Sequence, residues 1–243
     1  MKSLFSYNTT NSTQIMCGRY SLIATEKRIV QELPFTEETG VPIRDSYNIA
    51  PTQSACVITN EEPYRVRYLT WGLIPSWSKD GKKSGKLINA RAESIFTKPS
   101  FRVPIRRQRC LVVADSFYEW KRNGTRKLPY RILPADDSLL VMAGIWEEWK
   151  GYGETRRSFS IITTPPNAQI AELHNRSPVV LTDAAECQNW LENNSLDDLN
   201  ALMQPARDAY FRYYRVSEMV NSVHNNSPHL HEPVPEERDL FSA

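Results

Sequence analysis

Two apolar runs rich in strand-forming residues constrain the fold of this chain more than any other feature. They span Leu139–Trp146 and Phe159–Thr163. Runs of this length and composition are typical of strands in the middle of a sheet. Further strands are predicted at three places. Apolar and polar residues alternate over Tyr64–Trp71, Cys110–Val113 is expected to be a buried strand from which the chain leaves through Phe117–Trp120, and Phe211–Val216 is expected to be the last strand. The core is therefore predicted to be built mainly from strands.

Short helices are predicted between these strands from the positions of capping residues and prolines. They span Glu26–Leu33 with Thr25 as its N-cap, Pro165–Leu173 capped by Thr164, Asp183–Leu191 after Thr182, and Asp197–Met203. Sixteen prolines against nine glycines indicate long, stiff loops. Because no repeat or linker divides the chain, we predict an α+β fold: one compact domain with a mixed or barrel-like β-sheet core and a few short helices.

The composition is typical of a soluble globular protein, with 40% hydrophobic and 24% charged residues in a chain of 243. No apolar run approaches the roughly 20 residues that span a membrane. Residues 1–16 are polar and lack the apolar centre of a signal peptide. We expect them to be an N-terminal extension that is disordered, untranslated or removed, followed by a domain at 17–233 and a tail at 234–243. The expected location is the cytoplasm, at the nucleoid in a bacterium.

The four cysteines, at positions 17, 56, 110 and 187, are widely spaced and form no C-x-x-C pair. Without a secretory signal they are expected to be reduced thiols. His224, His229 and His231 lie near one another in the sequence, but no cysteine accompanies them. The ligand spacing therefore predicts no metal site.

Positive charge is concentrated in the middle of the chain. From Lys79 to Arg131 there are fifteen Lys and Arg against four acids, a net charge of +11 in 53 residues, although the whole chain carries only +2. From Ser217 to Ala243 the net charge is −4. This distribution indicates a surface for a polyanion. The alternative is a solvated lysine-rich loop, which suits residues 79–86 better than the arginines at 102, 106, 107 and 109.

Cys17 follows a second methionine that could start the chain, Met16. If Cys17 became the first residue, it would carry an α-amine with a pKa of about 8 beside a thiol with a pKa of about 8.5. Such an aminothiol condenses with an aldehyde to a thiazolidine ring, which an internal cysteine cannot do. The alternative is a small buried residue near the start of a strand.

Polar residues occur within two strand-like, mostly apolar segments. Asn89, Arg91 and Glu93 alternate with small and apolar residues, which would place all three on one face of a strand. The alternative is a surface ion pair between Arg91 and Glu93. Glu119 lies among aromatic residues, where burial would raise the pKa of its carboxyl and suit it to act as a general acid. Its alternative is a buried ion pair with an arginine.

Three further residues stand at boundaries between elements. His174 follows a predicted helix and precedes a proline turn, a place where functional residues gather, although a lone histidine is more often structural. Trp71 and Trp77 flank a loop that contains Pro75. Trp77 is predicted to face outward as a platform for stacking bases, whereas Trp71, at the end of a strand, suits the core.

Together these segments resemble one known family. The chain is similar to the SOS-response-associated peptidase (SRAP) family, which crosslinks to abasic sites in single-stranded DNA. The matching stretches are MCGRY at 16–20, YNIAPT at 47–52, WGLIPSW at 71–77, INARAES at 88–94, CLVVADSFYEWKR at 110–122, HNRSPVVL at 174–181 and VNSVHNNSP at 220–228. They occur in the family's order and extend over most of the chain from Met16 to about Pro233.

The resemblance implies a catalytic set and a set that lines the DNA. The implied catalytic residues are Cys17, Asn89, Glu119 and His174. The residues implied to line the DNA site are Arg19, Asn48, Pro51, Trp77, Arg91 and Arg176. No metal or organic cofactor is implied. The implied partner is single-stranded DNA with abasic sites, including junctions with duplex, bound by a monomer.

The implied reaction joins Cys17 to the aldehyde of the abasic sugar as a thiazolidine, with lyase and self-processing peptidase activities as further expectations. Glu119 would open the sugar, Asn89 would hold the reacting oxygen or amine, and His174 would orient the sugar or move a proton in the reverse step. Two other classes remain open. One is an N-terminal-nucleophile hydrolase that unmasks Cys17 by cutting off the extension. The other is a non-catalytic module that binds nucleic acid.

Two departures from the family pattern matter. The extension 1–16 blocks the α-amine of Cys17 unless it is absent or removed. Ser177 stands where the family commonly has methionine, and His224 stands where lysine is common. Neither substitution removes a catalytic group.

Overall fold

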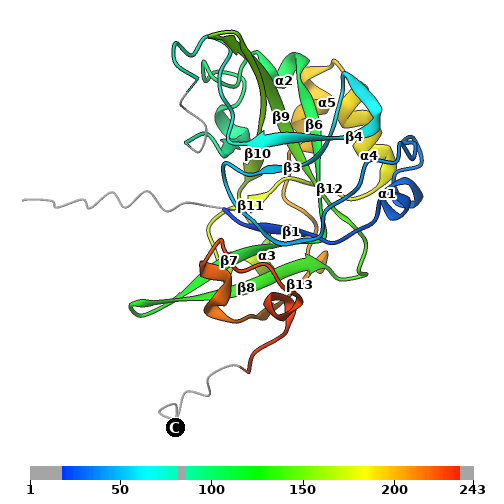
Figure 1. The fold of residues 1–243 in the computed structure, drawn as a ribbon. Helices are drawn as coiled ribbons and strands as arrows, with labels where there is room; N and C mark the ends of the chain where they lie inside the picture. The colour runs from blue at the N-terminus through cyan, green and yellow to red at the C-terminus, as the bar shows by residue number, and fades with distance from the viewer. Residues whose placement is uncertain (1–17, 82–85, 236–243) are drawn as a thin grey trace, which may run out of the picture.

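The apolar runs form the wall of a β-barrel in the computed structural model, which describes residues 18–81 and 86–235 (Figure 1). Within these ranges the barrel strands, in order of neighbours, are β10 (Glu154–Thr164), β4 (Glu62–Trp71), β3 (Ser54–Thr59), β6 (Arg109–Ala114) and β9 (Leu140–Gly151). The barrel closes because β9 pairs back onto β10. The β4–β10 pair is parallel and the other neighbours are antiparallel. The predicted α+β fold with a mixed, barrel-like core is confirmed.

Three very short strands extend the barrel at β10 and β9. Strand β5 (Asn89–Arg91) runs parallel to β10, β11 (Ser177–Pro178) runs antiparallel to the end of β10, and β12 (Val180–Leu181) pairs with β9. Thr163 of β10 is the register partner of both Arg91 and Pro178. The end of β10 therefore brings together two segments that are far apart in the sequence.

A second, antiparallel sheet packs against the barrel and lies below it in Figure 1. Its strands, in order, are β13 (Phe211–Arg215), β8 (Arg126–Pro134), β7 (Ser116–Asn123), β1 (Tyr20–Leu22) and β2 (Ser46–Ile49). The chain crosses from the barrel into this sheet at Asp115, between β6 and β7. The Asp115 carboxylate accepts hydrogen bonds from Ser21 Oγ and from the Ile23 backbone N–H, which fixes the crossing point.

The helices are short and lie on the outside. They are α1 (Glu26–Glu32), α2 (Pro104–Arg107), α3 (Ala168–Ala171), α4 (Ala184–Glu192) and α5 (Leu196–Leu202), with 3₁₀ turns η1 (Ala92–Ser94), η2 (Glu218–Asn221) and η3 (Pro228–His231). Thr25 caps α1 as predicted. None of the helices within 18–81 and 86–235 has the length and apolar character needed to cross a membrane.

The predicted helix at Pro165–Leu173 starts too early. Its N-cap is Asn167, whose side chain accepts from the Ile170 N–H, and the helix covers only Ala168–Ala171. Thr164 cannot cap a helix because it still belongs to β10, where it pairs with Ser177. The pairing of β10 with β11 thus keeps Thr164 in the sheet, and the helix begins later in the sequence.

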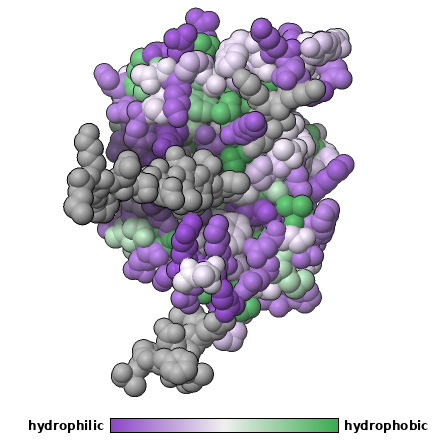
Figure 2. Space-filling view, turned by 90° about the vertical axis from the view of Figure 1, so that its left-hand side faces the viewer, coloured by the Kyte–Doolittle hydropathy of each residue, from purple (hydrophilic) through white to green (hydrophobic). Residues whose placement is uncertain are grey.

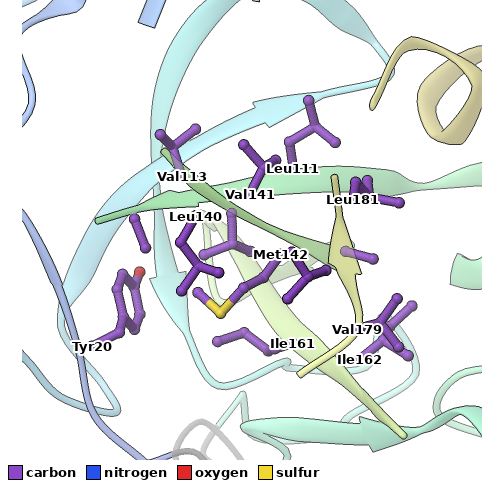
Figure 3. Packing of buried hydrophobic residues seen from close by; sticks show 14 of the residues in the cluster. Tyr20, Leu111, Val113, Leu140, Val141, Met142, Ile161, Ile162, Val179 and Leu181 are labelled. Carbon is purple, nitrogen blue, oxygen red and sulfur yellow. The ribbon is translucent and has the colours of Figure 1, made fainter. Parts of the chain in front are cut away.

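Buried aliphatic side chains from several strands pack inside the barrel, among them Val113, Met142 and Ile161 (Figure 3). Tyr20 of β1 extends the hydrophobic core from the barrel to the second sheet. Its ring packs edge-on against the buried Trp71 at a centroid distance of 5.0 Å. Trp71 also donates from its indole to the Ile88 carbonyl, which confirms its predicted place in the core.

Arg109 is buried at the start of β6, with 1% exposure, and binds the ends of two helices. Its guanidinium donates to the carbonyls of Ile105 and Arg106 in α2 and to those of Trp190, Leu191 and Asn193 at the end of α4. Helix C-termini leave such carbonyls without partners in the helix itself. The suggestion that Arg109 serves a phosphate is therefore wrong, because all its donors are used inside the protein.

His231 packs the C-terminal turn η3 against the second sheet. Its ring meets Tyr47 edge-on at 4.8 Å between centroids, and its Nε2 is buried without a hydrogen-bond partner among the described residues. Burial, reinforced by the charge of Arg131, lowers the pKa of His231 to about 4. The folded protein therefore favours the neutral form of the His231 ring.

Acidification below about pH 6.5, the ordinary histidine pKa, is expected to destabilise the fold through His231. Between that pH and the folded pKa of about 4, the unfolded chain binds the proton more tightly, so the free energy of unfolding falls as pH falls. Above about pH 6.5 the group has no effect. Denaturant unfolding at about pH 7 and pH 5 measures how much of the free energy of unfolding is lost on acidification. This loss should be smaller for His231→Gln than for the parent or for the exposed-site control His224→Gln. Equal losses of the free energy of unfolding in all three proteins would show that His231 is not the cause.

Candidate active site and nucleic-acid interface

Glu119 and His174 meet at the junction between the two sheets. Glu119 lies on β7 and is 1% exposed, and His174 follows α3 and is 6% exposed. His174 Nδ1 lies 3.9 Å from Glu119 Oε1, although 55 residues separate them in the sequence. The backbone N–H of His174 donates to the Ile170 carbonyl, which fixes the ring at the end of α3. Two residues predicted for catalysis therefore lie side by side.

The surroundings of His174 keep its imidazole neutral. Burial lowers its pKa, and the nearby charge of Arg176 acts in the same direction. Nδ1 lies 3.2 Å from the Arg176 backbone nitrogen and 3.4 Å from the Arg176 carbonyl oxygen, so it accepts from the first or donates to the second according to the tautomer. Nε2 is itself buried and has no hydrogen-bond partner among the described residues. Nδ1, rather than Nε2, is therefore the ring nitrogen that lies near the Glu119 carboxyl.

Arg176 joins this pair to β5. Its guanidinium makes a two-pronged ion pair with Glu93, which lowers the pKa of that carboxyl, and it donates to the Thr163 carbonyl of β10. Glu93 lies in η1 rather than in the strand, so only Asn89 and Arg91 share the predicted strand face. Glu93 binds Arg176 directly, and the charge of Arg91 also helps to lower the pKa of the Glu93 carboxyl. The Arg176 side chain, which was predicted to line DNA, is largely engaged in holding β5 in place.

Asn89 and Arg91 line a groove of about 650 Å³ in the surface beside β5. Lys86, Lys98 and Phe101 complete its basic and aromatic lining. Arg91, Lys86 and Lys98 are exposed, so their charges face solvent and can meet phosphates. The sequence placed Lys86 and Lys98 in the basic stretch, but nothing in it showed that these two would share a groove with Asn89.

The start of β1 lies next to Glu119. Tyr20 pairs with Phe117, and the Arg19 carbonyl accepts from the Tyr118 N–H. Continuing this antiparallel register places Gly18 opposite Glu119. Cys17 and the predicted extension 1–16 lie outside the described residues, so the predictions for them stay predictions.

Arg19 and Asn48 support a C-terminal loop. Arg19 donates to Asn48 Oδ1 and to the Val220 carbonyl, each at 2.7 Å. Asn48 is 2% exposed, and its Nδ2 donates to the carbonyls of Ser222 and Asn225. These two residues, predicted to line DNA, position the loop that borders the site. His224, which stands where lysine is common in the family, is exposed on this loop.

Trp77 is 55% exposed, as predicted for a stacking platform. Its loop follows β4, and the Leu73 N–H donates to the Leu87 carbonyl, which ties the beginning of the loop to the chain just before β5. Pro51 is half-buried at a turn before Thr52, whose φ is 74°. Ser177, which stands where the family commonly has methionine, is buried at 1% exposure, and its hydroxyl donates to the Pro178 carbonyl.

The cysteines in the described ranges are poor nucleophiles. Cys56, Cys110 and Cys187 are free and buried, and burial raises the pKa of all three thiols, that of Cys56 to about 12. Residues 18–81 and 86–235 also contain no group of three His, Cys, Asp or Glu side chains placed to hold a metal ion. A thiol nucleophile would therefore have to come from Cys17.

The fold and the site define a class of protein: a mixed β-barrel with a buried Glu–His pair and a basic groove. The model of the family described as SOS response associated peptidase (SRAP) matches residues 16–223. The chain belongs to this family.

Its relatives include named proteins from a bacterium and a vertebrate. It is 42% identical to abasic site processing protein YoqW of Bacillus subtilis over 223 residues, covering 88% of this chain and 98% of that protein. It is 32% identical to abasic site processing protein HMCES of Gallus gallus, covering 90% of this chain and 78% of the relative. A crystal structure of a Bacteroides thetaiotaomicron protein superposes with a TM-score of 0.79 at 28% identity, covering 90% of this chain and all of the other.

Proposed function

We propose that this protein processes abasic sites in single-stranded DNA by linking them covalently to Cys17 of a mature chain that begins at that residue. The names of its relatives support this substrate. The observation that carries the proposal is the placement of the buried Glu119–His174 pair beside the start of β1. An N-terminal nucleophile would emerge next to a carboxyl and an imidazole. The protein acts as a monomer in the cytoplasm and, if its host is a bacterium, at the nucleoid.

The proposed reaction begins with the abasic sugar, which is mostly a closed hemiacetal. Glu119 transfers a proton that helps to open the ring and expose the aldehyde. The Cys17 α-amine attacks C1′ and water leaves, which gives a Schiff base. Sγ then adds to the same carbon while the nitrogen takes up a proton, and a thiazolidine closes. The net change is the loss of one water.

The remaining groups hold the substrate. Asn89 can hydrogen-bond the reacting oxygen or amine from the groove beside β5. The neutral His174 can hydrogen-bond a sugar oxygen and can exchange a proton when the adduct reverses. Arg91, Lys86 and Lys98 suit the phosphates of the strand, and Trp77 suits a stacked base.

Replacing Glu119 and His174 one at a time is expected to separate ring opening from reversal. Glu119→Gln should slow adduct formation on a closed abasic sugar by roughly 100-fold, the scale of lost general-acid catalysis, but much less on a simple reactive aldehyde. His174→Ala should leave the yield nearly intact and slow release to a competing abasic strand. Time courses of formation and strand exchange measure both steps. Equal slowing of both steps by both variants would show that the pair only shapes the pocket.

A peptidase remains the second candidate because the family description carries that word. An N-terminal cysteine beside Glu119 and His174 also suits amide cleavage. Incubating the mature protein with a peptide spanning residues 1–20 and, separately, with an abasic oligonucleotide distinguishes the candidates. The proposal expects a covalent product with the DNA and no turnover of the peptide.

A further inference from the structure

The loop that follows β4 lies along the hairpin of β9 and β10. Near the start of the loop, the Ile74 backbone N–H donates to Ser158 Oγ of β10 at 2.8 Å. Further along, the Ser78 carbonyl accepts from the Trp149 indole of β9 at 2.7 Å. Gly81 has a φ of 61°, and a Cβ added to it would lie 2.9 Å from the Trp149 ring. The loop therefore contacts the hairpin over much of its length.

A third contact lies between these two. Glu147 of β9 is the cross-strand partner of Ser158, so the two side chains share one face of the sheet. Trp149, two residues further along β9, lies on the same face. The Glu147 carboxyl accepts hydrogen bonds from the hydroxyl and the backbone N–H of Ser76. One face of the hairpin thus holds three alternate residues of the loop, at positions 74, 76 and 78.

Trp77 stands between two of the residues that are held. The Ser78 N–H donates to the Pro75 carbonyl at 2.9 Å, which closes a turn with Ser76 and Trp77 at its centre. Trp77 is 55% exposed, whereas both of its neighbours in this turn are bonded to β9. The hairpin therefore fixes the backbone on each side of the indole that was predicted to stack on a base.

Glu147 is an unusual residue for this position in a strand. It is 6% exposed, and burial raises the pKa of its carboxyl. Within the described residues only the two Ser76 donors oppose this shift, and no cation contributes. Glu148, on the opposite face of β9, instead pairs with Arg157 and Lys150. Because a buried carboxyl costs free energy unless its oxygens are bonded, the contact with the turn is what compensates for the burial of Glu147.

We propose that Glu147 is a positioning residue for single-strand binding, which holds the 75–78 turn so that Trp77 presents its ring to a base. This inference rests on the proposed function, in which Trp77 stacks on the bound strand. The hairpin rises toward the upper left of Figure 1, and the upper part of that side displays mostly hydrophilic side chains in Figure 2. Such a surface suits nucleic acid better than an apolar partner.

The test is a double-mutant cycle on non-covalent binding of one single-stranded oligonucleotide that lacks an abasic site. Glu147→Ala removes the acceptor, and Ser76→Ala removes the hydroxyl from the exposed side of the same contact. Each substitution is made alone and together with Trp77→Ala. Glu148→Ala, which removes a carboxylate from the opposite face of β9, is the matched control. Denaturant unfolding establishes that each variant is folded, and Ser76→Ala decides alone if Glu147→Ala is not.

Trp77→Ala should weaken binding about tenfold, the scale of one lost base stack. Glu147→Ala should weaken it about fivefold and Ser76→Ala about threefold, the scale of one or two lost hydrogen bonds. Neither should weaken it further once Trp77 is absent, because both act through that residue. Glu148→Ala should bind as the parent does. Equal weakening with and without Trp77, or no weakening by a folded variant, would overturn the proposal.

Tryptophan fluorescence gives a second measurement. The part of the emission that Trp77→Phe removes should be quenched by saturating DNA in the parent and less so in Ser76→Ala. Unchanged quenching with weakened binding would assign the loss to another contact and overturn the proposal. Adduct formation on an abasic strand is assayed separately. A parent protein that forms no adduct contradicts the proposed function, whereas a protein that forms the adduct but gives an additive cycle contradicts this inference alone.

Discussion

Cys17→Ala is expected to abolish the stable adduct with an abasic single strand, because the sulfur that closes the thiazolidine is gone. Cys17→Ser keeps the α-amine and is expected to yield a Schiff base that borohydride traps. The measurement is the fraction of DNA shifted on a denaturing gel, with and without reductant. Cys56→Ala provides the matched control, since that thiol is buried in the barrel with a raised pKa.

Stable adducts from both Cys17 variants without reductant would identify another residue as the crosslinker. No other thiol in residues 18–81 and 86–235 is placed for this role, because Cys56, Cys110 and Cys187 are all buried. The prediction thus tests the assignment of the nucleophile separately from DNA binding.

Arg109→Met is expected to lower the free energy of unfolding by more than about 3 kcal/mol. The substitution leaves five carbonyls at the ends of α2 and α4 without their donor, and each buried orphan costs about 1–3 kcal/mol before relaxation. Arg109→Lys should also destabilise, since one ammonium cannot reproduce a planar fork that reaches both helices. Arg107→Met, at the exposed neighbouring position, should stay within about 0.5 kcal/mol of the parent. Denaturant unfolding measures all three, and a stable Arg109→Met would contradict the assigned structural role.

The strands were predictable because continuous apolar runs leave few other solutions. Leu139–Trp146 and Phe159–Thr163 fall within the paired barrel strands β9 and β10. Closure of the barrel was not predictable, since the parallel pairing of β4 with β10 joins segments separated by a long stretch of sequence. The late start of α3 was not predictable either, because a tertiary contact causes it: Thr164 pairs with Ser177 of β11 and so stays in the strand.

Charge counting predicted a basic surface but not which residues form it. Arg109 and Arg131 belong to the basic stretch, yet Arg109 binds helix ends and Arg131 bonds to Ser116 and Tyr214 inside the second sheet. An arginine's partners depend on tertiary placement, which no local pattern records. The exposed position of Trp77 and the burial of Trp71 did follow from sequence, because Pro75 and the end of a strand set their surroundings.

The site was predictable as a set of residues but not as a geometry. The family resemblance selected Glu119 and His174, and their separation of 3.9 Å emerges only from the packing of α3 beside β7. Arg176 was selected as a DNA contact, but its ion pair with Glu93 gives it a positioning role. Residues that hold the site and residues that touch the substrate look alike in a sequence motif.

Intact mass of the protein purified from its native host, before and after incubation with an abasic single strand, tests the central claim most directly. The expected result is a chain that begins at Cys17 and a product heavier by the oligonucleotide less one water. A chain that keeps Met1 and still forms the same adduct would contradict it, because a blocked α-amine cannot close a thiazolidine.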